Sequence, residues 1–293
     1  MDKKVTFDFY KVEMPYGYSF ETAIDELSKV TELKNRVVEI NGDPLRWEEI
    51  DTSSRFITGD LVKLRMYLLP SKGGLHSKVE DIGLEADEGI AEETVFFYDK
   101  NTKTLVYQRN RYGVSASRFQ DYLLHFYKPK GGTIDFLPLL RKSGLERLDK
   151  MDEIRKFSYR LARPTDNKYN RISDGSTEES IELLDDLSAM AVNIELSMGH
   201  YKGSMAIDKV KERAKKLFRR ESTKANEPKK IFISGVDEYG VPDQFDLLDL
   251  RIKQEESLTP DHNRRLTYAA RKSAANRAFR QNVEEVEDLY EEK

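Results

Sequence analysis

Regular alternation of apolar and polar residues limits most strongly how this chain of 293 residues can fold. In the clearest case, Val192, Ile194, Leu196 and Met198 alternate with Asn193, Glu195 and Ser197. Because successive side chains of a strand point to opposite faces, this pattern predicts a strand with one buried face. The same alternation at Val5, Phe7 and Phe9 predicts a strand at the N-terminus.

Turn and cap residues between the apolar segments predict the remaining elements. Asn41-Gly42 is typical of a two-residue hairpin turn, and a second hairpin is expected between residues 94–98 and 105–109. Helices are expected after Ser115, after Ser176 with its capping partner Glu179, and after Pro260. The fold class predicted is α+β, with mixed, mainly antiparallel sheets, helices packed on one face and a long C-terminal helix.

The chain is long enough for two ordinary domains. A short helix around residues 136–148 marks the passage between the two halves. We therefore expect an N-terminal α+β part with β-hairpins at 1–150 and a second part at 151–293. The second part has the order strand, helix, strand, helix, two strands and helix, in which Leu248, Leu250 and Ile252 belong to the last strand.

Composition excludes several classes of protein. The chain has no cysteine, which rules out disulfides, thiolate metal sites and cysteine nucleophiles. Its four histidines are far apart in sequence, so a histidine-rich zinc site is not expected. The N-terminus has no apolar signal core, and no stretch approaches the roughly 18 apolar residues of a membrane span. We expect a cytoplasmic protein without a metal ion, a cofactor or a membrane contact.

One predicted helix, at 205–220, carries a line of positive charge opposite its apolar face. The residues 201–230 contain eleven Lys or Arg and four acids, a local net charge of +7 in a chain of net charge −4. Charge this local favours binding to a phosphate backbone, although a solvated outer helix face has the same pattern. The expected nucleic-acid contacts are Lys202, Lys209, Arg213, Lys216, Arg219 and Arg220.

The C-terminal segment 260–293 is basic first and acidic at its end. Such a helix can pair with a second copy of itself or with a protein partner, or it can dock on the body through Leu266, Ala270 and Ala274. Its acidic residues would repel phosphate, so we expect docking or self-association there rather than nucleic-acid binding.

A string of arginines and small hydroxyl residues lies where a strand passes into a helix. Free backbone N–H groups at the start of that helix make an anion site plausible, as does an ordinary connection with a serine cap. The residues of this hypothetical anion site are Arg109, Arg111, Ser115, Ser117 and Arg118.

Acidic residues in the second half allow a different hypothesis. Asp237, Asp243 and Asp249, with Lys253 nearby, resemble only loosely the carboxylates and lysine that hold Mg²⁺ in some nucleases. A chain with 53 acidic residues produces such combinations by chance. A metal-dependent nuclease is therefore an alternative to the binding hypothesis.

Three strings of the chain resemble, taken together, families of uncharacterised bacterial proteins. They are DEGIAEET at 87–94, QRNRYGVS at 108–115 and ISGVD at 233–237. The resemblance implies a protein of a prophage or another mobile element, or of a phage-defence system, and it assigns no catalytic residue. The sequence hence favours a non-enzymatic module that binds DNA or RNA.

Overall fold

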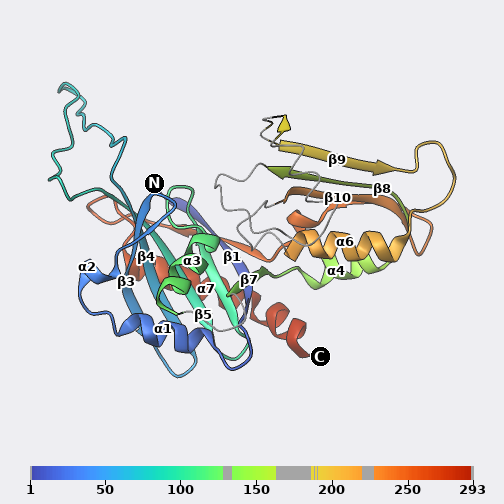
Figure 1. Ribbon diagram of the computed structural model, residues 1–293, viewed down its shortest axis with the longest axis horizontal. Helices are drawn as coiled ribbons and strands as arrows, with labels where there is room; N and C mark the ends of the chain where they lie inside the picture. The colour runs from blue at the N-terminus through green and yellow to red at the C-terminus, as the bar shows by residue number, and fades with distance from the viewer. Residues whose placement is uncertain are drawn as a thin grey trace. The chain divides into compact units, whose positions relative to one another are not determined.

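The computed structural model describes residues 2–127, 134–162, 186–187, 189, 191–219 and 228–291. These residues form two β-sheets with helices packed on them, which confirms the α+β class (Figure 1). Every strand pair whose register is known is antiparallel.

The larger sheet has eight strands. Their spatial order is β12 (Lys253–Leu258), β1 (Lys3–Glu13), β6 (Thr104–Arg109), β5 (Ile90–Asp99), β4 (Phe56–Arg65), β3 (Asp43–Thr52) and β2 (Val38–Ile40), and β7 (Asp135–Pro138) also pairs with β1. Its helices are α1 (Phe20–Ser28), the short α2 (Leu33–Arg36), α3 (Ala116–Phe126) and α7 (Tyr268–Glu291).

Both predicted hairpins are present in this sheet. Asn41 and Gly42 join β2 to β3 with φ angles of 55° and 78°, and Ile40 pairs with Asp43 across the turn. Positive φ at both central residues gives a turn whose twist matches that of the strands, which explains the Asn-Gly sequence. Strands β5 and β6 form the second hairpin.

Helices cover both faces of the larger sheet, rather than the single face that the sequence predicts. On one face, the Phe20 ring of α1 lies 6.2 Å from that of Phe96 in β5. On the other face, Phe279 of α7 lies 5.3 Å from Phe97. Because neighbouring residues of a strand point to opposite faces, the adjacent phenylalanines of β5 receive different helices, with α1 and α3 in front of the strands and α7 behind them (Figure 1).

The smaller sheet has four strands in the order β11 (Pro242–Asp246), β10 (Pro228–Asp237), β8 (Met151–Ala162) and β9 (Ala191–Ser197). It belongs with helices α4 (Lys142–Asp149) and α6 (Ile207–Arg219) and with a single 3-10 turn, η2 (Leu247–Leu250). The predicted alternating strand is β9, which is the edge strand of this sheet among the strands that the structure describes.

Packing divides the chain into two units that are discontinuous in sequence. The first consists of Met1–Asp8, Val12–Ile134 and Gln254–Gln281, and the second of Phe9–Lys11, Asp135–Lys253 and Asn282–Lys293. The division into subdomains at 1–150 and 151–293 stays a prediction.

Three local predictions are wrong. The helix expected around residues 136–148 begins only at Lys142, because Asp135–Pro138 form strand β7, which pairs with β1. Leu248 and Leu250 belong to the turn η2, because the Asp246 carboxylate accepts a hydrogen bond from the Leu248 N–H at 3.0 Å and caps that turn. The last helix begins at Tyr268 and not after Pro260. The helix predicted after Ser176 lies largely outside the described residues.

No helix in the described part of the chain combines the length and the apolar character needed to cross a membrane.

Candidate nucleic-acid interface

Helix α6 presents the predicted cations because its apolar residues recur every three or four positions and are buried. Val210, Ala214 and Leu217 pack into the core of the second unit. The approach to the helix is fixed by a hydrogen bond of 2.9 Å from the Met205 N–H to the Ile154 carbonyl of β8. The buried face sets the rotation of the helix, and the basic residues are left on its flanks.

The basic stripe, which we define as Lys209, Arg213 and Lys216, follows one flank of α6. Lys209 is exposed and has no ion-pair partner among the residues that the structure describes. The Arg213 guanidinium lies 5.9 Å from the centroid of the Tyr159 ring. The Lys216 ammonium lies 2.7 Å from the Glu212 carboxylate and lowers the pKa of Glu212. Because that pair is mostly exposed and weak, Lys216 can exchange it for a phosphate.

The cations on the other flank of α6 have a structural role. Lys211 donates a hydrogen bond of 2.7 Å to the Asp149 carbonyl, and Lys215 lies 3.1 Å from the Asp149 carboxylate. Asp149 ends α4, so these two ammonium groups sit at the negative end of that helix, where positive charge is favourable. Lys211 and Lys215 therefore hold α6 against α4.

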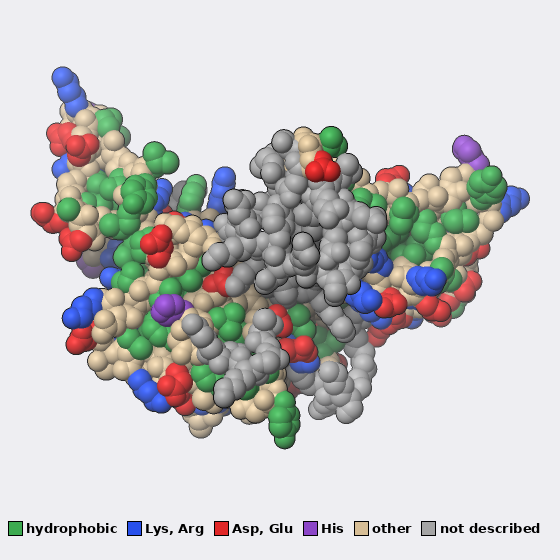
Figure 2. Space-filling model, in the orientation of Figure 1, with side chains coloured by type: hydrophobic (Ala, Val, Ile, Leu, Met, Phe, Trp, Pro, Cys, Tyr) green, Lys and Arg blue, Asp and Glu red, His purple; other side chains and the backbone are tan. Residues whose placement is uncertain are grey.

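The other predicted contacts are partly described. Lys202 is exposed in the turn that leads from β9 to α6. The Arg219 side chain and the whole of Arg220 lie outside the described residues. On the face seen in Figure 2, the described lysines and arginines lie among acidic side chains.

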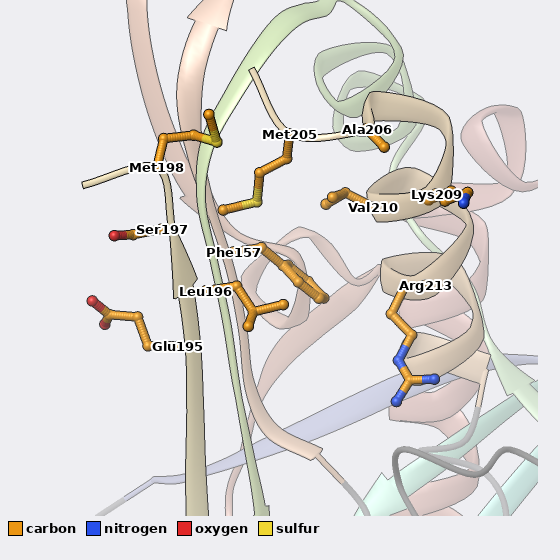
Figure 3. A pocket seen from close by; sticks show the side chains of 10 residues that line it. All are labelled: Phe157, Glu195, Leu196, Ser197, Met198, Met205, Ala206, Lys209, Val210 and Arg213. Carbon is orange, nitrogen blue, oxygen red and sulfur yellow. The ribbon is translucent and has the colours of Figure 1, made fainter. Parts of the chain in front are cut away.

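A groove runs between the stripe and the edge strand β9. Figure 3 shows its floor, formed by apolar side chains of both elements, and Arg213 on the α6 wall. Its volume is about 690 Å³. It is lined by Phe157, Glu195, Leu196, Ser197, Met198, Met205, Ala206, Lys209, Val210 and Arg213.

Two arginines of the predicted anion site form ion pairs with different carboxylates. Arg109 makes two hydrogen bonds to Asp8, at 2.9 and 2.6 Å. Arg118 is bound to Asp43. The guanidinium of Arg111 lies 5.7 Å from the centroid of the neighbouring Tyr112 ring. The structure thus directs Arg109 and Arg118 to two different acids.

The serines of that string form the start of α3. The Ser115 hydroxyl accepts a hydrogen bond from the Arg118 N–H at 3.3 Å and lies 3.0 Å from the Ser117 hydroxyl. The turn before them requires Gly113, since a Cβ there would lie 2.2 Å from the Thr94 hydroxyl. These contacts are those of a capped connection, and anion binding at this place stays a prediction.

Two of the three acids of the nuclease alternative, Asp237 and Asp243, have structural partners. Arg147 donates two hydrogen bonds to the Asp243 carboxylate, one of 2.7 Å, and lowers the pKa of Asp243. The Asp237 carboxylate accepts hydrogen bonds from the N–H groups of Tyr239 and Val241 in the β10–β11 turn. Within the described ranges, no group of three or more His, Asp or Glu residues could hold a metal ion.

Helix α7 uses its basic residues inside the first unit. Arg271 is 2% exposed and donates two hydrogen bonds, of 2.6 and 2.7 Å, to Asp60 of β4. Arg277 lies 2.9 Å from Glu256, and Lys272 lies 2.7 Å from Asp51. Residue 274 is buried, as the docking alternative predicts, and a partner for the exposed residues of 260–293 stays a prediction.

Sequence reasoning missed the groove and the buried Arg271–Asp60 pair. The alternation at 192–198 indicates one buried face, yet Leu196 on that face is 51% exposed because β9 is an edge strand. Nothing in the local sequence distinguishes Arg271 from the exposed arginines beside it, because its partner lies 211 residues away.

Comparison with known proteins gives a family and no function. No curated protein matches the chain. The model of a family described as "Family of unknown function (DUF6731)" matches residues 1–289. The chain therefore belongs to this family of unknown function.

Proposed function

We propose that this protein is a non-enzymatic module that binds DNA or RNA through the basic stripe of α6. The phosphate contacts are made by Lys209, Arg213 and Lys216, with Lys202 beside them. The resemblance of the sequence to mobile-element families supports a cytoplasmic role for this module in a prophage or phage-defence system.

The observation that carries the proposal is the line of cations on one exposed flank of a well-anchored helix. Positions 209, 213 and 216 are separated by about one helical turn each, so the charges lie roughly 4.5–6 Å apart along the axis and the stripe is about 10 Å long. One strand of double-stranded DNA places a phosphate about every 3.4 Å along its axis, so about three phosphates fall within the length of the stripe. Each neutralised phosphate releases condensed counterions, which is the main source of affinity for a site of this kind.

The charge distribution also explains how an acidic chain can bind a polyanion. A net charge of −4 gives no long-range attraction to nucleic acid, whereas residues 201–230 carry a local charge of +7. Charges within about 10 Å, one screening length at 0.1 M salt, dominate the interaction. The binding should therefore be of moderate affinity and steeply dependent on salt.

Fluorescence anisotropy tests the proposal, with the full chain and labelled single- and double-stranded DNA and RNA over a salt series. The doubly substituted variant Lys209→Gln/Arg213→Gln should lower the slope of log Kd against log salt by about 2.

The matched control is the variant Arg160→Gln/Lys230→Gln. It removes the same charge from the face of the smaller sheet that α6 does not cover, where these residues are cross-strand neighbours. If the control weakens binding as much as the stripe variant does, the interface lies elsewhere. If the unmodified chain binds none of the four nucleic acids at low salt, the proposal is wrong.

A further inference from the structure

We infer that the groove between α6 and β9 binds an extended, acidic and apolar peptide segment of a protein partner, which adds to the edge of the smaller sheet as a fifth strand. The inference does not depend on nucleic-acid binding, although both would use Lys209 and Arg213.

The first argument comes from the backbone of β9. This strand ends the sheet order, and no described strand pairs with its outer edge. In an antiparallel sheet, alternate N–H and C=O groups of an edge strand point away from the sheet and are open to another chain. An extended peptide satisfies these groups with its own backbone, which nucleic acid cannot do in the same register.

The second argument comes from the floor of the groove. Leu196 pairs with Phe157 across β8 and β9, and its side chain is 51% exposed beside Met198 and Met205. An added strand would place every second side chain over this floor (Figure 3). Met and Leu accommodate varied apolar side chains. Phe157 itself is 1% exposed, so it offers no ring face on which a base could stack.

The third argument comes from charge. The α6 wall of the groove carries Lys209 and Arg213, and both are among the lining residues. The one acid of the lining, Glu195, lies 2.9 Å from Lys156, and its side chain points away from α6 in Figure 3. Lys209 is exposed and has no ion-pair partner among the described residues, so the segment that fits carries Asp or Glu beside its apolar residues.

A library of random decapeptides displayed on phage tests the inference with the full chain as bait. Enrichment of peptides that combine apolar residues with Asp or Glu is expected. Enrichment of basic peptides, or of none, would overturn the proposal. The dissociation constant of the most enriched peptide is then measured with the unmodified chain and with variants.

Three variants locate the binding. Leu196→Asp and the double variant Lys209→Glu/Arg213→Glu should each weaken peptide binding at least tenfold. The control Arg160→Glu reverses a charge on the opposite face of β8 and should change it less than twofold. Circular dichroism confirms that each variant is folded. Binding that survives the groove variants would contradict the inference.

A competing oligonucleotide separates this inference from the proposed function. Displacement of the peptide by single-stranded DNA indicates that both ligands use the stripe. A peptide that binds while no nucleic acid does leaves the groove site standing and rejects the proposed function. If an oligonucleotide binds and is weakened tenfold by Leu196→Asp, while no peptide is enriched, the groove belongs to nucleic acid and the inference is wrong.

Discussion

Helix α6 and the first half of helix α7 both carry several Lys and Arg residues and use that charge in opposite ways. On α7, the cations face carboxylates of the larger sheet, and Arg271 is buried against Asp60. On α6, the buried face is apolar, two lysines hold the end of α4, and the basic stripe faces solvent and the groove. The density of Lys and Arg in a helix therefore does not indicate whether it binds a ligand. What matters is whether the surface on which the helix packs supplies carboxylates that pair with these charges.

This difference has an energetic consequence. A charge that is buried in a pair has lost its hydration, so removing its partner leaves an uncompensated ion in the interior. Burial raises the pKa of Asp60, and the hydrogen bonds from Arg271 oppose that rise. The charge of the exposed Lys209 keeps its hydration until a ligand arrives. Substitutions on α7 should hence change stability, and those on the stripe should change binding.

The largest effect is expected from Arg271→Met, which leaves Asp60 buried without its partner. We expect a loss of about 3–5 kcal/mol in the free energy of unfolding, measured with urea at pH 7. The double variant Arg271→Met/Asp60→Leu should recover most of this loss, because it removes both charges. A loss below about 1 kcal/mol in the single variant would show that the pair is not desolvated as described.

A smaller effect is expected from Arg277→Met. The Glu256 side chain is 8% exposed while that of Arg277 is 47% exposed, so only one partner is desolvated. Loss of a partner for a buried polar group costs about 1–3 kcal/mol. Chemical denaturation gives the value, and Arg280→Met, at an exposed position on the same helix, is the control and should lie within about 0.5 kcal/mol of the unmodified chain.

A pH-dependent effect is expected at Asp51. Hydrogen bonds from Lys272 and Tyr268 lower the pKa of Asp51. A lowered pKa in the folded state gives stability that is present above the unfolded value of about 3.9 and is lost as the pH falls through the folded value. Because the side chains of Asp51 and Lys272 are both more than a third exposed, Asp51→Asn should cost no more than about 1 kcal/mol at pH 7. The cost should shrink as the pH falls below the unfolded value of about 3.9, and a cost that does not change with pH would exclude a charge effect.

The smallest effect is expected on α6. Lys209→Gln and Lys216→Gln should each change the free energy of unfolding by less than about 0.5 kcal/mol, since both side chains are exposed. The measurement is again urea unfolding at pH 7. A loss above about 1 kcal/mol at Lys209 would mean that the stripe has a structural partner like those of α7, and the contrast between the two helices would fail.

Local sequence signals predicted the turns and helix caps whose geometry depends on residues that are close together in the chain. Asn41-Gly42 forms the hairpin turn, and Ser115 caps α3, because each depends on its own backbone. The start of α7 was misplaced for the same reason. Thr259 resembles a cap, but its hydroxyl bonds Asp2, while Thr267 accepts the hydrogen bond from the Ala270 N–H at 3.3 Å. Sequence spacing alone does not show which of two possible cap residues stands at the start of the helix.

The sequence predicts the line of cations on α6, but it does not predict the groove beside them. Helical periodicity places Lys209, Arg213 and Lys216 on one flank, as observed. The groove exists because β9 is an edge strand, and strand order depends on contacts far apart in the chain. The same holds for Lys272, whose partner Asp51 lies 221 residues away.

Because the first unit is discontinuous in sequence, its segments are synthesised at different times. The ribosome completes residues 12–134 first and must then add the whole stretch 135–253 before Gln254–Gln281 can follow. At about 5–20 residues per second, that stretch of about 120 residues takes roughly 6–24 s. During this interval, the Phe97 face of the larger sheet lacks Phe279, and Asp60 lacks Arg271. The nascent protein thus exposes an aromatic surface until its last helix emerges, and a chaperone that binds it there would act before α7 arrives.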